Sequence, residues 1–262
     1  MHLAKAMEEP VFGLCPLCLQ QKRLEKSHYL GRALHLLSQT GGEAVFMTPQ
    51  RIELSARQIW AHLLCGDCED ILAKNESYAH QWINRKERFP LLERLKVAAP
   101  VRWTPNGTEF SGAAIGVSTE RLAHFALGIF WRASVSKWRT LGLQTTSIDL
   151  SALAEPIRLY LRGEGPFPTG CALLMTVCTD HGSQGLVFGP NPTSGGIFPC
   201  ISMLVRGIKF TLVVGDSLPA ELREACCASS AQKVIFLRDC AADAQHAFGH
   251  LYQTAEVDPR LQ

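Results

Sequence analysis

The sequence predicts an α+β fold in two parts, a domain at residues 1–99 and a second domain at residues 100–262. Two observations concern the first domain: its cysteines form two Cys-x-x-Cys pairs, and apolar residues recur at helical spacing after the second pair. In the second domain, a long apolar helix precedes five short β-rich segments, separated by Gly, Pro and Asn clusters as in an antiparallel meander. Pro100 and the turn sequence Thr-Pro-Asn-Gly soon after it interrupt the pattern and mark the boundary.

The composition excludes several classes of protein. With 262 residues, 47% of them apolar and 19% charged, the chain has material for a large core and is neither wholly disordered nor fibrous. A net charge of +2 is not the strongly basic balance typical of nucleic-acid binders. Residues 1–140 nevertheless hold 18 Lys and Arg against 13 Asp and Glu, whereas residues 141–262 hold 8 against 11. This asymmetry places any polyanion contact in the first half, although an ordinary solvated surface explains the same counts.

No segment of the sequence predicts export or membrane insertion. Acidic residues near the start occupy the place of the apolar run of a signal peptide. No stretch approaches the roughly 18–20 uninterrupted apolar residues of a membrane span. We therefore expect a cytoplasmic protein that makes no membrane contact. In that reducing compartment, paired cysteines favour metal ligation over disulfide formation.

The first domain is expected to contain two strands between helices. A Gly-Gly step ends the first helix, and a polar turn joins the strands. In chain order the expected elements are a tight turn (12–18), a helix (30–40), two strands (43–48 and 57–65), a helix from Cys68 onward and a charged helix (85–96).

A long helix over residues 118–138 is the main element expected in the second domain. Ser118 or Thr119 caps it, and apolar residues surround almost its whole circumference, so we expect a buried helix. Arg132 is a charge within this apolar stretch; an internal pair with an acid is the expected role, and contact with phosphate is the alternative. The remaining expected elements are a helix (150–162), five strands (171–178, 185–189, 197–205, 209–214 and 233–237) and a C-terminal helix (241–253).

Four of the ten cysteines have the spacing of a metal site: Cys15, Cys18, Cys65 and Cys68. Each Cys-x-x-Cys turn directs both sulfurs to one side, and four thiolates suit tetrahedral zinc. A redox dithiol would need one such pair within a βαβ unit, and the sequence pattern shows no such unit. The order of knuckle, hairpin and helix is that of a treble-clef zinc unit. The other six cysteines lie mostly in apolar sequence and are expected to pack as small buried side chains.

The order of these motifs resembles that of the zinc-bearing HNH, or His-Me finger, endonucleases, including phage endonuclease VII. The strings that carry the resemblance are CPLC, KSHYLGRAL and LLCGDCEDILAKNE, within roughly residues 12–80. A set of uncharacterised bacterial HNH-like proteins is similar too, with a later phrase like FALGIFWRASVSKW. The resemblance implies that the four cysteines hold a structural zinc, that His28 is a general base and that Glu69 binds a catalytic Mg²⁺ or Mn²⁺.

The implied residues suit hydrolysis of a phosphodiester in DNA or RNA. His28 would take a proton from water, and an ion held by Glu69 would stabilise charge on the phosphate and the leaving oxygen. The sequence departs from the family pattern, since Ser27 stands where a metal-binding residue usually precedes the base. The structural alternatives are that His28 bonds a backbone carbonyl and that Glu69 is a favourable first-turn acid. Two functions stay open: a metal-dependent endonuclease, and a non-catalytic zinc-stabilised module that binds nucleic acid or a protein.

Overall fold

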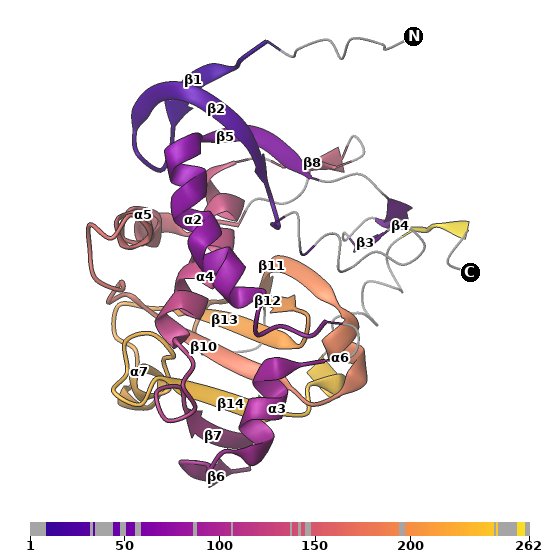
Figure 1. Cartoon of the computed structure of the whole chain (residues 1–262), viewed down its shortest axis with the longest axis vertical. Coiled ribbons are helices and arrows are strands. Elements are labelled where there is room, and N and C mark those ends of the chain that lie inside the picture. The colour runs from indigo at the N-terminus through magenta and orange to yellow at the C-terminus, as the bar shows by residue number, and fades with distance from the viewer. Residues whose placement is uncertain are drawn as a thin grey trace.

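The computed structural model confirms the α+β class. It describes residues 9–31, 34, 44–47, 51–55, 59–85, 88–105, 107–136, 138–140, 143–144, 148–193, 197–243, 245 and 256–259. Figure 1 shows a small sheet at one end of the molecule, a larger sheet toward the other end, and the helices α2 and α4 between them. Most of the helix predicted at 30–40 and of the helix predicted at 241–253 lies outside the described residues.

The small sheet is antiparallel and has the strand order β1-β2-β5. Helix α2 begins immediately after β5, as the cysteine spacing predicts. The bounds are β1 Phe12–Cys15, β2 Gln20–His28, β5 Trp60–Cys65 and α2 Gly66–Ala79. Between β2 and β5 in the sequence lies a hairpin whose second strand also pairs with a short C-terminal strand; the bounds are β3 Ala44–Met47, β4 Arg51–Ser55 and β15 Glu256–Val257.

The large sheet has seven strands in the order β11-β12-β13-β10-β14-β7-β6. Its neighbours are antiparallel except for β10 and β14, which run parallel, so the predicted meander is correct for β11 to β13 alone. The turn sequence assigned to the domain boundary joins β6 and β7, two strands that the sequence pattern did not predict. The bounds are β6 Arg102–Thr104, β7 Gly107–Ser111, β10 Cys171–Cys178, β11 Val187–Thr193, β12 Cys200–Val205, β13 Ile208–Val214 and β14 Val234–Arg238.

The other helices surround these sheets. No helix in the described part of the chain is long and apolar enough to cross a membrane. The bounds of the helices are α3 Pro90–Val97, α4 Thr119–Val135, the 3₁₀ helix η1 Ser151–Leu153, α5 Ala154–Leu161, α6 His181–Gly185 and α7 Ala220–Glu224. A separate two-stranded ribbon consists of β8 Arg139–Thr140 and β9 Leu143–Gln144.

Helix α4 is buried at the centre of the molecule, as predicted. The Ser118 hydroxyl accepts a hydrogen bond from the Arg121 N–H at 3.4 Å, which caps the helix. Gly128 lies where a side chain would meet both α2 and α5. Phe125 packs edge-on against Phe210 of β13. One apolar core therefore runs from the small sheet through α2 and α4 to the large sheet, across the boundary predicted at residue 100. The two-domain division itself stays a prediction.

An ion pair between Glu76 and Arg132 lies in this core and joins α2 to α4. The guanidinium side chain is 2% exposed and the carboxylate 17% exposed. Arg132 also donates to the Gly128 carbonyl oxygen at 3.3 Å. The internal acidic partner expected for Arg132 is thus confirmed, and it is Glu76.

We predict that Glu76→Gln destabilises the protein by roughly 3–5 kcal/mol, because it leaves the buried guanidinium without a counter-charge. Urea unfolding measures the change. Glu93→Gln is the matched control, since Glu93 pairs with an exposed Arg88 at 3.2 Å and such pairs contribute about 0–1 kcal/mol. Replacing both core partners, as Glu76→Leu with Arg132→Met, should recover most of the loss. Equal costs for the two Glu→Gln changes would contradict this account.

Candidate metal centre

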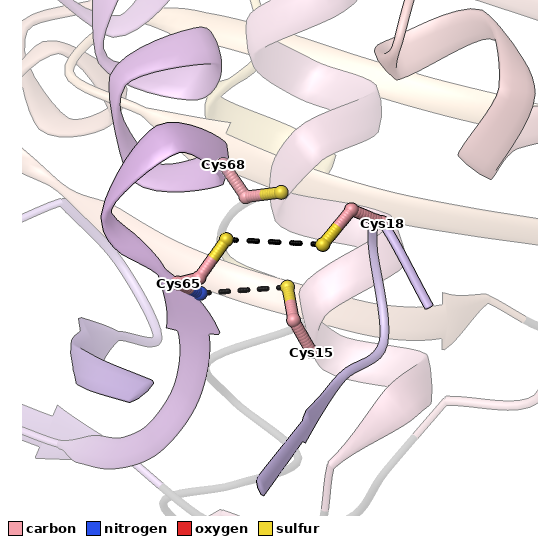
Figure 2. Close-up of side chains that lie close together, drawn as sticks. All are labelled: Cys15, Cys18, Cys65 and Cys68. Atoms are coloured by element: carbon pink, nitrogen blue, oxygen red, sulfur yellow. Dashed lines mark hydrogen bonds between the residues drawn. The ribbon is translucent and has the colours of Figure 1, made fainter. Parts of the chain in front are cut away.

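The four cysteines predicted as zinc ligands come together. Their sulfur atoms all lie within 4.8 Å of one another, and Figure 2 shows them pointing toward a common centre. The Sγ atoms of Cys18 and Cys65 are 3.8 Å apart. Four sulfurs at about 2.3 Å from a tetrahedral zinc are separated by about 3.8 Å, so the spacing fits this ion. The donor set and the geometry are consistent with one structural zinc.

Local backbone geometry explains how each pair presents its sulfurs. Cys15 ends β1, and the turn after it closes through a hydrogen bond from the Leu19 N–H to the Cys15 carbonyl oxygen at 2.8 Å. Leu19 has φ 58°, the left-handed conformation that reverses the chain into β2. In the second pair, Cys65 is the N-cap of α2 and Cys68 lies in its first turn. The Cys65 N–H donates to Cys15 Sγ at 3.4 Å and so links the two pairs.

A buried arginine from the second predicted domain supports the first knuckle. Arg158 of α5 donates to the Leu17 carbonyl oxygen at 2.7 Å, between the two cysteines of the pair. Its other nitrogens bond both carboxylate oxygens of Glu155, at 2.7 and 2.8 Å. The knuckle therefore depends on residues about 140 positions away, because Leu17 and Arg158 are 141 residues apart.

The thiols differ in how readily they ionise. Burial opposes ionisation of Cys15, but hydrogen bonds from the N–H groups of Cys18, Cys65 and Leu17 outweigh it and lower the pKa of Cys15 to about 7. Burial raises the pKa of Cys65 and that of Cys68, and a charge on Cys15 raises both further. In the metal-free protein, Cys15 therefore ionises before Cys65 and Cys68, and binding of an ion must displace the protons of these two thiols.

The residues implied as catalytic occupy two faces of the small sheet. Ser27 is fully buried; its hydroxyl donates to the Glu69 carboxylate and accepts the Leu64 N–H at 3.0 Å. His28 is the next residue of β2 and lies opposite Trp60 of β5. Because successive side chains of a strand point to opposite faces, His28 points away from the face on which Ser27 meets Glu69. The structure thus places the Glu69 carboxylate against the Ser27 hydroxyl, on the face opposite His28.

Within the described residues, two groups hold three or more potential metal ligands, and neither contains His28 or Glu69. One is the four-cysteine group. The other consists of Cys178, Asp180 and Cys240, which the sequence analysis did not predict. It forms because β10 and β14 are parallel neighbours, so the chain segments at their carboxyl ends meet, and no signal in the sequence indicates that pairing.

This second group is a pair of buried thiols beside a capping carboxylate. A hydrogen bond from Cys178 lowers the pKa of Cys240, and the same bond, together with burial, raises the pKa of Cys178. The two carboxylate oxygens of Asp180 accept the Ser183 N–H at 2.7 Å and the Cys240 N–H at 3.0 Å. With three ligand atoms, the group has one fewer than a structural zinc site requires. Of the six cysteines expected to be buried, five are, and Cys200 is half-buried.

Comparison with protein-family models, with curated proteins and with solved structures finds no match to this chain. The metal centre therefore rests on the geometry of its own residues. The resemblance to HNH endonucleases stays a prediction.

We predict that the purified protein holds about one zinc ion in the four-cysteine group, and that Cys65→Ser loses it together with the folded state of residues 12–80. Elemental analysis measures the ion, and limited proteolysis measures the folding. Cys200→Ser is the matched control, because that sulfur lies outside both ligand groups. A Cys65→Ser protein with undiminished zinc would exclude this ligand set.

Zinc retention should fall as the pH is lowered. A zinc ion bound here would hold these cysteines as thiolates in the folded protein, so the stability that it provides should be present at higher pH and be lost as protons compete for sulfur. Because burial raises the pKa of Cys65 and Cys68, this competition should already be measurable between roughly pH 7 and pH 5. Release into a colorimetric chelator across that range is the measurement, and a pH-independent release would contradict it.

Proposed function

We propose that this chain is a zinc-stabilised, non-catalytic module that binds single-stranded nucleic acid on the outer face of the small sheet. The four-cysteine unit, of treble-clef type, would keep that sheet rigid. The observation that carries the proposal is a group of exposed aromatic and basic side chains on this face. We define the outer face by Phe12, Arg23, Lys26, His28 and Trp60.

Strand register supports placing these residues on one face. Phe12 lies opposite Arg23, and His28 lies opposite Trp60, and directly paired residues share a face. Leu24 lies opposite Cys65, and Lys26 lies opposite His62, so the register shift between them places one extra residue in β5. On β2, Leu24 packs against the core and Ser27 is fully buried. Arg23 precedes Leu24 and His28 follows Ser27, so both side chains point to the opposite, outer side.

The exposure and charge of the outer face suit bases and phosphates. Phe12 is 71% exposed and Trp60 is 43% exposed, which is unusual for side chains of this size. The Lys26 ammonium lies 4.5 Å from the centre of the Trp60 ring. Unstacked bases pack on such aromatic rings, while Arg and Lys contact the phosphates. A protein partner is less well matched, because cations alternate with the aromatic rings.

The endonuclease is the second candidate, and the position of His28 on the outer face is what favours it. A nucleic acid lying there would be next to the imidazole. Against it, the Glu69 carboxylate accepts the Ser27 hydroxyl on the inner face, so the two implied catalytic groups do not share a site. The binding module requires no such convergence.

Binding should weaken about 5- to 150-fold in Trp60→Ala, since one base–aromatic stacking contact contributes about 1–3 kcal/mol. Fluorescence anisotropy with a labelled single-stranded oligonucleotide measures the change. Trp103→Ala is the matched control: Trp103 is 77% exposed but belongs to β6 of the large sheet. The proposal fails if the wild type does not bind, or if both substitutions have the same effect.

Plasmid nicking with Mg²⁺ or Mn²⁺ distinguishes the two candidates. A binding module should leave the plasmid intact as wild type, as His28→Ala and as Glu69→Ala. Nicking by the wild type that both substitutions abolish would establish the endonuclease instead.

A further inference from the structure

A cavity of about 370 Å³ lies away from the metal centre, between three segments of the chain. The segments are the link between α2 and α3, helix α6, and the turn between β12 and β13. The residues that line it are Asn84, Arg88, Phe89, His181, Gln184, Gly185 and Arg206. Three of these side chains are basic, and none of the described lining residues is acidic. One of the three, Arg88, also pairs with Glu93 of α3 at 3.2 Å, outside the lining. The cavity thus has the charge of an anion site.

Arg206 is the buried member of this group. The residue is 7% exposed. Its Nε donates to the Asn84 carbonyl oxygen at 3.1 Å, and one terminal nitrogen donates to the Gly185 carbonyl oxygen at 3.0 Å. A guanidinium has five N–H donors, so three remain for a ligand. Burial lowers the pKa of Arg206, an effect that a bound anion would offset.

Arg206 differs from the other buried arginines in its ion-pair partners. Three arginines are buried in the described part of the structure: Arg132, Arg158 and Arg206. Arg132 pairs with Glu76, and Arg158 forms a two-point pair with Glu155. Arg206 makes no ion pair among the described residues. A buried charge without a counter-charge is costly, so its counter-ion is expected to come from outside the chain.

The backbone of Arg206 has a left-handed conformation, which is uncommon for arginine. Arg206 and Gly207 form the two-residue turn between β12 and β13, with φ 48° and 89°. Such turns favour Asn or Asp followed by Gly, because the left-handed conformation is strained for other residues. Arginine occupies the strained position here, where its side chain reaches the cavity.

We propose that this cavity binds a phosphate monoester of a small molecule. The planar Arg206 fork matches two phosphate oxygens, and Arg88 and His181 supply further donors from more exposed positions. Phe89 provides an apolar wall for the organic group. The volume lies at the lower end of the range for small-molecule sites and exceeds what inorganic phosphate alone would fill.

Calorimetric titration of the zinc-loaded chain with phenyl phosphate tests the proposal, in a chloride background that fixes the ionic strength. We expect saturable binding of one ligand per chain, and a corresponding rise in the unfolding temperature. Arg206→Lys should weaken binding about tenfold or more, because lysine cannot make the two-point contact. Benzoate binding as tight as that of phenyl phosphate would overturn the assignment to phosphate.

Two further variants keep the test valid if Arg206→Lys fails to fold. Arg88→Gln and His181→Gln alter exposed side chains and leave the carbonyl contacts of Arg206 in place, and each should weaken binding several-fold. Arg223→Gln on α7 is the control, because it removes the same charge outside the cavity. Absence of saturable binding by the wild type, or equal weakening in the control, would overturn the proposal.

Discussion

The packing of α2 against α4, with the Glu76–Arg132 ion pair inside it, is the contact on which the positions of the other features depend. Helix α2 begins at the second cysteine pair, and α4 packs against α5, which bonds the first knuckle through Arg158. A zinc ion held by the four cysteines would join the knuckle to the start of α2, while the core joins the rest of α2 to the large sheet. Metal binding and core packing therefore stabilise the same helix from its two ends.

In the small sheet, the adjacent residues Ser27 and His28 have different roles because their side chains lie on opposite faces. Ser27 faces inward and orients Glu69, whereas His28 faces outward beside Trp60. A sequence motif places the two residues next to each other but does not state which face each one takes. Because the side-chain period of a strand is two residues, neighbours in a motif are separated by the whole thickness of the sheet. The inner face is consequently structural, and the outer face is available to a ligand.

The three buried arginines differ in whether an acidic side chain of the described residues compensates their charge. Arg132 and Arg158 are compensated by acids of the chain, and each joins parts of the fold. Arg206 joins three segments through carbonyl oxygens alone and lines a cavity. The three arginines are similarly buried, and within the described residues only Arg132 and Arg158 contact a carboxylate.

The sequence alone determined the elements and the metal ligands whose signals are local. Two Cys-x-x-Cys turns, the capped apolar helix at 118–138 and the apolar run at 171–178 depend on neighbours within a few residues, and all three are found as predicted. Tertiary structure decided which distant groups meet: Arg132 with Glu76, Ser27 with Glu69, and Cys178 with Cys240. Those pairings follow from strand order and helix packing, which composition and spacing do not encode. That no described acid pairs with Arg206 is likewise visible only in the folded chain.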